Sequence, residues 1–246
     1  MSSGVFDPFK DFDTAGYLRN FDGEKDLDIV KVIEHQLFRA NLPTALAHLR
    51  RLTAITYADF LRVHRILFQG FYPWAGEDRS STAPESSIHK GQTLFSQPLS
   101  ARLAVNEGLR LGHDAQTMQL HPGEVMGLFA FGHPFLDGNG RIMLLVHAEL
   151  CQRAGFSILW QHTSKSDYLA ALTQEIASPG QGILDRYLLQ FIGPAQVSGA
   201  WLSTVVTLKG LDGSSAQDEI AGSFGDPAIA AQYKQFEAQR GYKIKD

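Results

Sequence analysis

The residues with the clearest chemical potential stand together in one short segment. Residues 133–141 read HPFLDGNGR, in which a histidine and an arginine bracket an aspartate and two turn dipeptides, Asp-Gly and Asn-Gly. Turn dipeptides in tandem, directly before an apolar helical pattern, expose several backbone N–H groups at the positive end of a helix. Such a helix start is suited to binding an anion, above all a phosphate.

The side chains of this segment extend the predicted phosphate site towards catalysis. Arg141, in the first helical turn, offers a planar set of donors to phosphate oxygens. Asp137 is a hard oxygen ligand that can hold Mg²⁺ while substrate phosphates supply other ligands. His133 titrates near neutral pH and can take a proton from an incoming hydroxyl. The alternative is a plain helix–loop–helix connection, but nine residues in this order favour phosphate-group chemistry.

The elements that must position this segment are mostly helices. Apolar residues recur at helical spacing on both sides of it. The predicted helices cover residues 27–40, 57–68, 98–111, 122–132, 164–177 and 184–192, and a further helix follows the loop and ends at Gly155. Pro43 is predicted to interrupt the helical pattern after residue 40, and Pro122 to begin the helix over 122–132. The sequence contains no sustained strand alternation and no internal repeat.

A long connection and a distinct C-terminal region complete the pattern. Residues 72–98 are rich in proline, glycine and serine, and predict a small hairpin around Lys90-Gly91. Residues 198–211 are apolar enough to pack on the body of the protein. Asp226-Pro227 predicts the start of an amphipathic helix that ends at Gly241.

The composition is that of an ordinary globular protein. Of 246 residues, 44% are hydrophobic and 20% charged, and the formal net charge is -4. This balance argues against a nucleic-acid-binding face, which would need a clustered basic patch. We expect neither a signal peptide nor a membrane span. The single cysteine, Cys151, excludes an internal disulfide and a multi-cysteine zinc site, and we expect a buried thiol in a cytoplasmic protein.

HPFLDGNGR resembles the signature of Fic-domain proteins, His-Pro-Phe-x-Asp/Glu-Gly-Asn-Gly/Lys-Arg, at every specified position. Further segments that resemble the family are TAGYLRN at 14–20, YPWAGEDR at 72–79, IHKGQTLF at 88–95 and DYLAAL at 167–172. The resemblance covers roughly residues 7–193. It implies an all-α fold, a Fic-type helical bundle with a small β-hairpin flap and a helical C-terminal appendage.

We therefore expect two regions in the chain. The catalytic domain covers residues 1–194, with its flap at about 80–98 and its signature loop at 133–141, and the C-terminal helical extension covers 195–246. The implied activity is transfer of AMP from Mg-ATP to a Ser, Thr or Tyr hydroxyl of a target protein.

The resemblance also implies a role for each residue of the signature loop. His133 is the general base, Asp137 holds Mg²⁺ and Arg141 pairs with the outer phosphates of ATP. The anion hole is formed by the backbone N–H groups of Gly138, Asn139 and Gly140. A lysine replaces the last of these glycines in the Doc-like kinase branch, so glycine favours nucleotidyl transfer. Tyr168 is expected near the adenine, the alternative being a half-buried structural tyrosine.

The flap is expected to align the target hydroxyl. An extended target segment can add as a strand to an exposed hairpin edge through main-chain hydrogen bonds. The positions that match the family's flap are Ile88, His89, Lys90, Gly91 and Gln92. The alternative for these residues is an ordinary surface loop.

One position departs from the family pattern. Many members have a second arginine one helical turn after the first, and this chain has Leu144 there. The second arginine helps to hold the γ-phosphate and pairs with an inhibitory glutamate in an antitoxin-like helix. Neither segment that approaches the inhibitory motif, at 81–86 or at 215–220, matches it fully. We expect no intrinsic inhibitory helix.

Three functions remain open from the sequence. The first is a protein AMP-transferase, the second the same scaffold with another donor such as UTP or a CDP-alcohol, and the third a non-catalytic peptide-binding module. Intact His133, Asp137 and Arg141 argue against the third. The expected partners are a target protein and a separate antitoxin. A bacterial toxin or a delivered effector fits this description.

Overall fold

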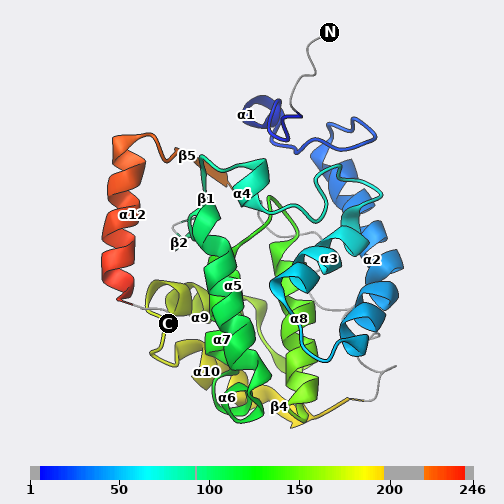
Figure 1. The fold of residues 1–246 in the computed structure, drawn as a ribbon, viewed down its shortest axis with the longest axis vertical. Helices are drawn as coiled ribbons and strands as arrows, with labels where there is room; N and C mark the ends of the chain where they lie inside the picture. Colours follow the sequence, from blue (N-terminus) through cyan, green and yellow to red (C-terminus); the bar gives the residue numbers. More distant parts are fainter. Residues whose placement is uncertain (1–5, 92, 197–218, 242–246) are drawn as a thin grey trace.

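Helix α8 (Asn139–Arg153) runs through the middle of the molecule, and the other long helices pack around it (Figure 1). The structure is a computed structural model that describes residues 6–91, 93–196 and 219–241. The helices in contact with α8 are α2 (Leu27–Arg51), α3 (Tyr57–Phe68), α5 (Pro98–His113), α6 (Ala115–Leu120) and α7 (Pro122–Gly132). The side chains of Leu145, Val146 and Leu150 are fully buried, so α8 forms the centre of the core.

Further helices and short strands complete the fold. The helices among them are α1 (Phe12–Ala15), α4 (Arg79–Thr82), α9 (Lys165–Ala177), α10 (Ile183–Leu188), α12 (Pro227–Arg240) and the 3-10 turns η1 (Trp160–His162) and η2 (Leu189–Phe191). Strands β3 (Phe156–Ile158) and β4 (Ile192–Pro194) pair antiparallel at the end that α6 also occupies. The predicted all-α bundle is confirmed.

Most predicted helices lie where their apolar periodicity placed them. The helix predicted over 57–68 is α3, which begins with a capping box between Thr56 and Asp59. The helix predicted to start at Asp226-Pro227 is α12, whose first turn donates a hydrogen bond from the Ala228 N–H to the Asp226 carboxylate. Gly241 ends α12 in the left-handed conformation that glycine favours.

The predicted interruption at Pro43 is wrong. Helix α2 continues through this proline to Arg51. The ring of Pro43 is on the exposed side, whereas Leu42, Leu46 and Leu49 continue the buried stripe. Burial of such side chains, worth about 1.5–3 kcal/mol each, outweighs the cost of about 3 kcal/mol for an internal proline.

The predicted hairpin is present and carries a third strand. β1 (Ser86–Lys90) and β2 (Thr93–Leu94) pair antiparallel around Gly91. β5 (Glu219–Ser223), from the C-terminal extension, pairs with the other edge of β1, with Ile220 opposite Ile88. The sheet order is β2-β1-β5. Strand alternation could not reveal strands of two to five residues, and the pairing partner of β1 is distant in sequence.

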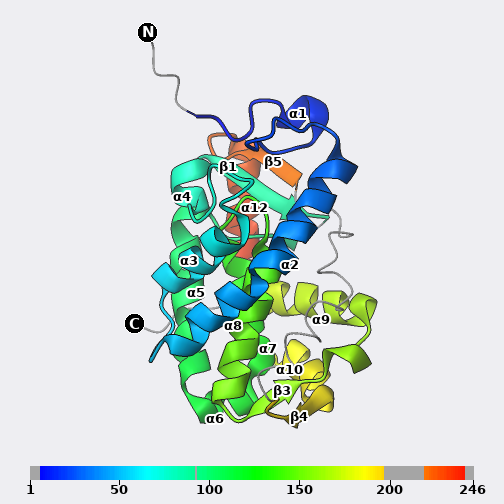
Figure 2. The same ribbon diagram turned by 90° about the vertical axis from the view of Figure 1, so that its right-hand side faces the viewer.

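Helix α12 of the C-terminal extension packs against α9 and β5 and lies at one side of the molecule (Figure 1). The guanidinium carbon of Arg240 lies 3.3 Å from the centroid of the Phe131 ring, and the Tyr233 hydroxyl lies 3.1 Å from the Ser87 hydroxyl. Figure 2 shows α12 behind the flap sheet. The predicted packing of residues 198–211 lies outside the described residues.

Two expectations from composition can be compared with the structure. Cys151 is buried, as predicted, and its Sγ lies 3.5 Å from Nδ1 of His147. Within the described ranges, none of the helices is both long enough and apolar enough to cross a membrane.

Candidate active site

The signature loop joins the end of α7 to the start of α8, and two left-handed residues shape it. His133 adopts φ 42° and ψ 57°, the only positive φ at a non-glycine residue in the described part of the chain. Such a conformation costs of order 1–3 kcal/mol, so the surrounding contacts must impose it. Gly138 adopts φ 80°, and a Cβ there would lie 2.7 Å from the Phe68 ring. The loop therefore requires glycine at position 138.

The loop is fixed to the core by Phe135 and Asn139. The Phe135 ring is fully buried and stacks on the ring of His64 at 4.0 Å between centroids. The Asn139 amide accepts a hydrogen bond from the Phe135 N–H at 2.9 Å and donates one to the Phe135 carbonyl at 2.8 Å. This pair of bonds crosslinks the loop, so the residues between them are held in one conformation.

Contacts from the flap region hold His133. Its ring stacks on the Phe95 ring at 3.7 Å, directly after β2. Its carbonyl accepts a 2.7 Å hydrogen bond from Nε of Arg79, whose Nη2 also donates to the Ser96 carbonyl at 2.7 Å. Ser96 in turn donates through its hydroxyl to the Gly132 carbonyl. Hydrogen bonds from the Arg79 and Ser96 side chains thus link the flap region to the backbone carbonyls of residues 132 and 133. His133 itself is 6% exposed.

Asp137 is the exposed carboxylate of the site. Its side chain is 36% exposed, and its carboxylate accepts a hydrogen bond from the Gly138 N–H. Its carbonyl lies 3.1 Å from Nε2 of His64. Because Nδ1 of His64 accepts from the Gly76 N–H, Nε2 carries the proton and donates to that carbonyl. Burial lowers the pKa of His64 to about 3, so the imidazole stays neutral in this role.

Arg141 lies in the first turn of α8 and is nearly buried. Its Nη2 lies 3.1 Å from a carboxylate oxygen of Glu34, on α2, and 3.7 Å from one of Asp137. Its guanidinium lies over the Phe68 ring at 4.7 Å. Nη1 of Arg141 is buried and makes no hydrogen bond. A buried donor without an acceptor is costly, so this nitrogen is suited to receive one from a ligand.

Glu34 is the buried partner of this arginine. Its side chain is 4% exposed and hydrogen-bonded to the Tyr72 hydroxyl as well as to Arg141. Burial and the charge of Asp137 raise the pKa of Glu34 to about 7, against the opposing effect of Arg141. The site thus contains two carboxylates that both lie near Nη2 of one guanidinium.

Gly140 differs from Gly138 in its surroundings. No atom lies within 4 Å of the position that a Cβ of residue 140 would take. Residue 140 is also exposed and has ordinary helical geometry. Packing therefore does not require glycine there. Open space at the N-terminal turn of α8 agrees with the predicted anion hole, because a phosphate has room to approach the backbone.

The structure brings only part of the predicted set together. His133, Asp137, Gly138, Asn139, Gly140 and Arg141 form one loop and helix start. Ile88 is buried and pairs through its backbone with β5, and His89 and Lys90 complete β1. Gly91 forms the turn, and Gln92 lies outside the described residues. The Tyr168 ring is edge-on to Trp160, at 5.3 Å between centroids.

Sequence reasoning missed three residues that hold the site, namely Glu34, His64 and Arg79. Glu34 carried a signal, because Val30, Glu34 and Phe38 recur at a spacing of four on the buried face of α2. A carboxylate in that stripe needs a buried partner. Arg79 was quoted as part of a family resemblance without a role, and nothing local to it indicates the distant carbonyls that it binds.

The positions relevant to inhibition lie as follows. Leu144, one turn after Arg141, is 7% exposed. Residues 81 and 82 belong to α4. Residues 219 and 220 belong to β5, and the preceding residues of the segment 215–220 lie outside the described part of the chain. Neither described piece forms an extended helix over the signature loop.

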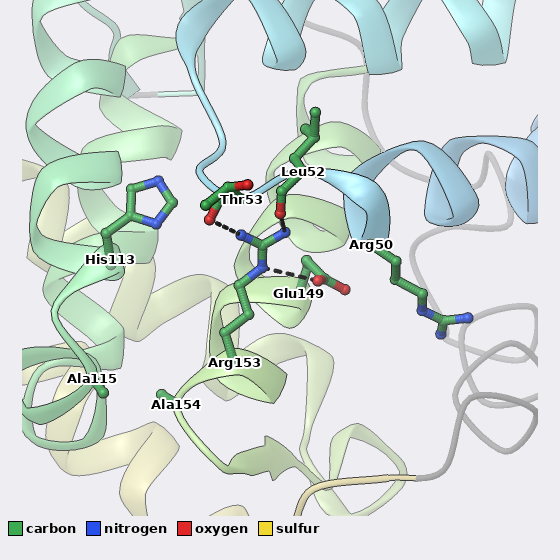
Figure 3. Close-up of a pocket in the computed structure, with 9 residues that line it drawn as sticks. Arg50, Leu52, Thr53, His113, Ala115, Glu149, Arg153 and Ala154 are labelled. Carbon is green, nitrogen blue, oxygen red and sulfur yellow. Dashed lines mark hydrogen bonds and ion pairs between the residues drawn. The ribbon is translucent and has the colours of Figure 1, made fainter.

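A pocket lies at the C-terminal end of α8, away from the signature loop (Figure 3). Arg153 projects into it, donating from Nε to Glu149 and from Nη1 and Nη2 to backbone carbonyls. Arg50 points away from Arg153 in Figure 3. Every guanidinium nitrogen of Arg153 therefore has an acceptor within the protein, whereas Nη1 of Arg141 at the signature loop has none.

Comparison with known protein families finds a match over a range that includes the signature loop. The model of the Fic/DOC family matches residues 54–151. The "Protein adenylyltransferase VbhT" of Bartonella schoenbuchensis is 28% identical over 184 residues, which are 68% of this chain and 35% of that protein. This chain thus spans about a third of the length of that curated relative. Within the described residues, Glu34 lies on a helix outside the matched range 54–151.

Solved structures share the fold. The BepC protein of Bartonella tribocorum, crystallised with AMPPNP, has a TM-score of 0.57 and 17% identity, over 73% of this chain and 93% of that chain. An N-terminal Fic domain from Bartonella quintana, crystallised with ADP, has a TM-score of 0.59 and 18% identity, over 80% and 97% of the two chains. At these identities the likeness concerns the fold.

Proposed function

We propose that this chain is a protein adenylyltransferase of the Fic/DOC family, whose model matches residues 54–151. In this reaction AMP passes from Mg-ATP to a Ser, Thr or Tyr hydroxyl of a target protein. The observation that carries the proposal is the joint position of three groups at the start of α8: His133 before it, Asp137 in the loop and the unpaired Nη1 of Arg141. The activity named for the VbhT relative supports the same reaction.

The chemistry follows from these groups. His133 takes the proton from the target hydroxyl, whose oxygen forms a bond to the α-phosphorus of ATP. The bond between that phosphorus and the oxygen bridging to the β-phosphate breaks, and pyrophosphate leaves. The N–H groups of Asn139 and Gly140, that of Gly138 once Asp137 releases it, and the guanidinium of Arg141 stabilise the charge on the phosphate oxygens.

The donor set at Asp137 fits a magnesium ion. Among the described residues no cluster of three or more His, Cys, Asp or Glu side chains could hold a metal, and the loop itself offers one carboxylate, that of Asp137. Mg²⁺ commonly binds one or two carboxylates and takes its other ligands from phosphates and water. Bound there, it would neutralise charge on the nucleotide phosphates. His64 orients Asp137 by donating to its carbonyl.

We propose further that the flap aligns the target. Phe95 and Ser96, directly after β2, contact His133 and the preceding carbonyl. A peptide paired with the hairpin would therefore be aligned relative to the base. β5 covers the outer edge of β1, so a docking peptide would use the β2 side, formed by Thr93 and Leu94, or displace β5. We propose Ile88–Gly91 and Gln92 as flap positions, Tyr168 as a nucleotide contact, and residues 1–194 as the catalytic unit.

The test is labelling of target protein. Purified protein, Mg²⁺ and α-³²P-ATP are added to a bacterial lysate, beside the variant His133→Ala. We expect a labelled band with the intact protein, and loss of a general base should lower labelling by about 10²–10⁴-fold. Equal labelling by both proteins would contradict the role of His133.

Leu144 makes the choice of donor part of this test. This buried leucine cannot contact a γ-phosphate through a charge. Parallel reactions with labelled UTP and a labelled CDP-alcohol therefore accompany the ATP reaction. We expect the target to be labelled with ATP as the donor. If only UTP or the CDP-alcohol gives label, the reaction is transfer of the group that this donor carries, and the proposed AMP transfer is wrong. Absence of label with every donor would favour a peptide-binding module.

A further inference from the structure

A carboxylate far from the signature loop in sequence is closest of all to its arginine. Glu34, on α2, lies 3.1 Å from Nη2 of Arg141, and the two residues are 107 positions apart. The next carboxylate, Asp137 on the loop itself, lies 3.7 Å from the same nitrogen. Two acceptors therefore face one donor, and the shorter contact belongs to the residue outside the loop.

Three further contacts fix this arrangement. The Tyr72 hydroxyl is hydrogen-bonded to the Glu34 carboxylate, which limits the positions that this carboxylate can take. The Phe68 ring lies under the Arg141 guanidinium at 4.7 Å, and the Phe38 ring lies at 6.0 Å. Glu34 and Arg141 are 4% and 8% exposed, so water competes little for their bond.

The consequence concerns the two loop charges. Arg141 and Asp137 are four residues apart at the start of a helix, a spacing at which opposite charges readily pair. The two groups form an ion pair at 3.7 Å, which is too long for a hydrogen bond. A direct hydrogen bond between them would use the carboxylate needed for a cation and the guanidinium needed for a phosphate. Glu34 takes the Nη2 donor instead, and Nη1 stays without a hydrogen bond.

We propose that Glu34 is a positioning residue that holds the Arg141 guanidinium away from Asp137, so that both loop charges remain available to a nucleotide phosphate and its Mg²⁺. The inference deepens the proposed function and rests on it. It assigns to α2 a part of the nucleotide site that lies outside the matched range 54–151. Tyr72 supports the same arrangement through Glu34.

The experiment measures binding of MgADP by isothermal titration calorimetry, which needs no target protein. Glu34→Ala removes the acceptor, and we expect the dissociation constant to rise about tenfold, the loss of about one charged hydrogen bond. The Mg²⁺ concentration that gives half-maximal ADP binding should also rise, because Arg141 can then pair with Asp137. Glu34→Gln keeps an acceptor of the same shape and should restore binding to within about threefold of the wild type.

Matched variants separate positioning from general damage. Asp28→Asn changes an exposed carboxylate on the same helix and should leave MgADP binding unchanged. Glu34→Asp withdraws the carboxylate by one methylene and should give an intermediate effect, even if the alanine variant does not fold. A crystal structure of Glu34→Ala should show the distance from Arg141 Nη2 to Asp137 Oδ1 shortened from 3.7 Å into hydrogen-bonding range.

The outcomes distinguish this inference from the proposed function. If folded Glu34→Ala and Glu34→Asp bind MgADP as tightly as the wild type, or more tightly, Glu34 does not position Arg141. If the wild type binds no MgADP, both ideas fail. If binding changes as expected but no protein is labelled with any donor, the transfer reaction fails and the positioning role stands.

Discussion

Helix α8 carries an arginine near each end, and the two differ in how their donors are used. At the C-terminal end, Arg153 donates to Glu149 and to the carbonyls of Leu49, Leu52 and Thr53, and all three of its nitrogens have acceptors (Figure 3). At the N-terminal end, Arg141 donates through Nη2 to Glu34, and its buried Nη1 has no acceptor.

We propose that the difference separates a structural arginine from a ligand-binding one. Arg153 donates to carbonyls in the last turn of α2 and in the two residues that follow it, where the helix itself supplies too few donors. Its hydrogen bonds are complete without a ligand, and a ligand would have to break them. Arg141 has a donor left over in a position of low exposure, which a folded protein tolerates where a ligand later supplies the acceptor. Sequence alone places both residues on one helix without separating their roles.

The largest expected effect is at the open end of α8. Arg141→Ala should lower AMP transfer at least about 100-fold, since it removes charge-assisted hydrogen bonds worth about 1.5–3 kcal/mol each. Initial rates with α-³²P-ATP measure this loss. The variant also leaves Glu34 buried without its partner, so the double variant with Glu34→Gln controls for that charge. Near-normal transfer in the double variant would remove the distinction between the two arginines.

At the other end, Arg153→Ala should affect stability. We expect the free energy of unfolding to fall by about 2–4 kcal/mol, because three carbonyls and the nearly buried Glu149 lose their donor. Urea unfolding followed by circular dichroism measures the change. The affinity for MgADP at a temperature where the variant is folded should stay within about threefold of the wild type. A large loss of affinity would mean that the two ends of α8 are coupled.

In the middle of α8, His147 resembles Arg153 in that its polar atoms have partners within the protein. A pH titration can test this structural role. His147 is fully buried, with Nε2 donating to the Pro122 carbonyl at 2.7 Å and Nδ1 facing Cys151. Burial lowers the pKa of His147 to about 4. An unfolded chain therefore binds a proton at this histidine below about pH 6.5, while the folded chain does so only below about pH 4. The stabilisation is complete above pH 6.5 and is lost as the pH falls towards 4.

The corresponding experiment compares the wild type with His147→Gln, whose amide can donate to the same carbonyl. We expect the wild type to lose up to about 3 kcal/mol more than the variant between pH 6.5 and pH 4. Denaturant unfolding at several pH values measures both slopes. His64, whose pKa burial lowers to about 3, contributes in the same direction in both proteins and serves as the background. Parallel slopes would place the acid sensitivity elsewhere.

The smallest effect concerns the glycines of the open end. Gly140→Ala should raise the free energy of unfolding by about 0.5–1 kcal/mol, because alanine favours a helix and meets no atom there. The same methyl group narrows the space before the backbone N–H groups, so MgADP should bind several-fold more weakly. Gly138→Ala, with φ 80° and the Phe68 ring at 2.7 Å, is the contrasting variant and should destabilise the fold. Tighter MgADP binding by Gly140→Ala would contradict an anion hole at this turn.

The sequence was informative wherever the signal was local. The limits of α3, the start of α12 and the hairpin at Gly91 follow from capping residues and turn glycines within a few positions. Pro43 misled because tertiary packing along α2 outweighs a local preference. The signature loop could be predicted as a candidate anion site because its glycines, aspartate and arginine lie within five consecutive residues.

The supporting residues were not predictable in the same way. Glu34, His64 and Arg79 act through contacts with residues 54 to 107 positions away. Strand β5 has five residues and is defined by its pairing with β1. Contacts between residues so far apart produce no periodic pattern in the sequence. The apolar spacing of α2 can therefore indicate that Glu34 is buried, but it cannot identify Arg141 as its partner.

The pairing of β1 with β5 has a consequence for how the chain folds during synthesis. Ser87 and Tyr233 are hydrogen-bonded although 146 positions separate them. At about 5–20 residues per second, a ribosome needs roughly 7–30 s to extend the chain from the first of these residues to the second. During that interval the outer edge of β1 has no partner from its own chain. An uncovered strand edge is a template for pairing with other chains, so the nascent protein should be most prone to aggregation, and most dependent on chaperones, in the seconds before residues 219–223 emerge.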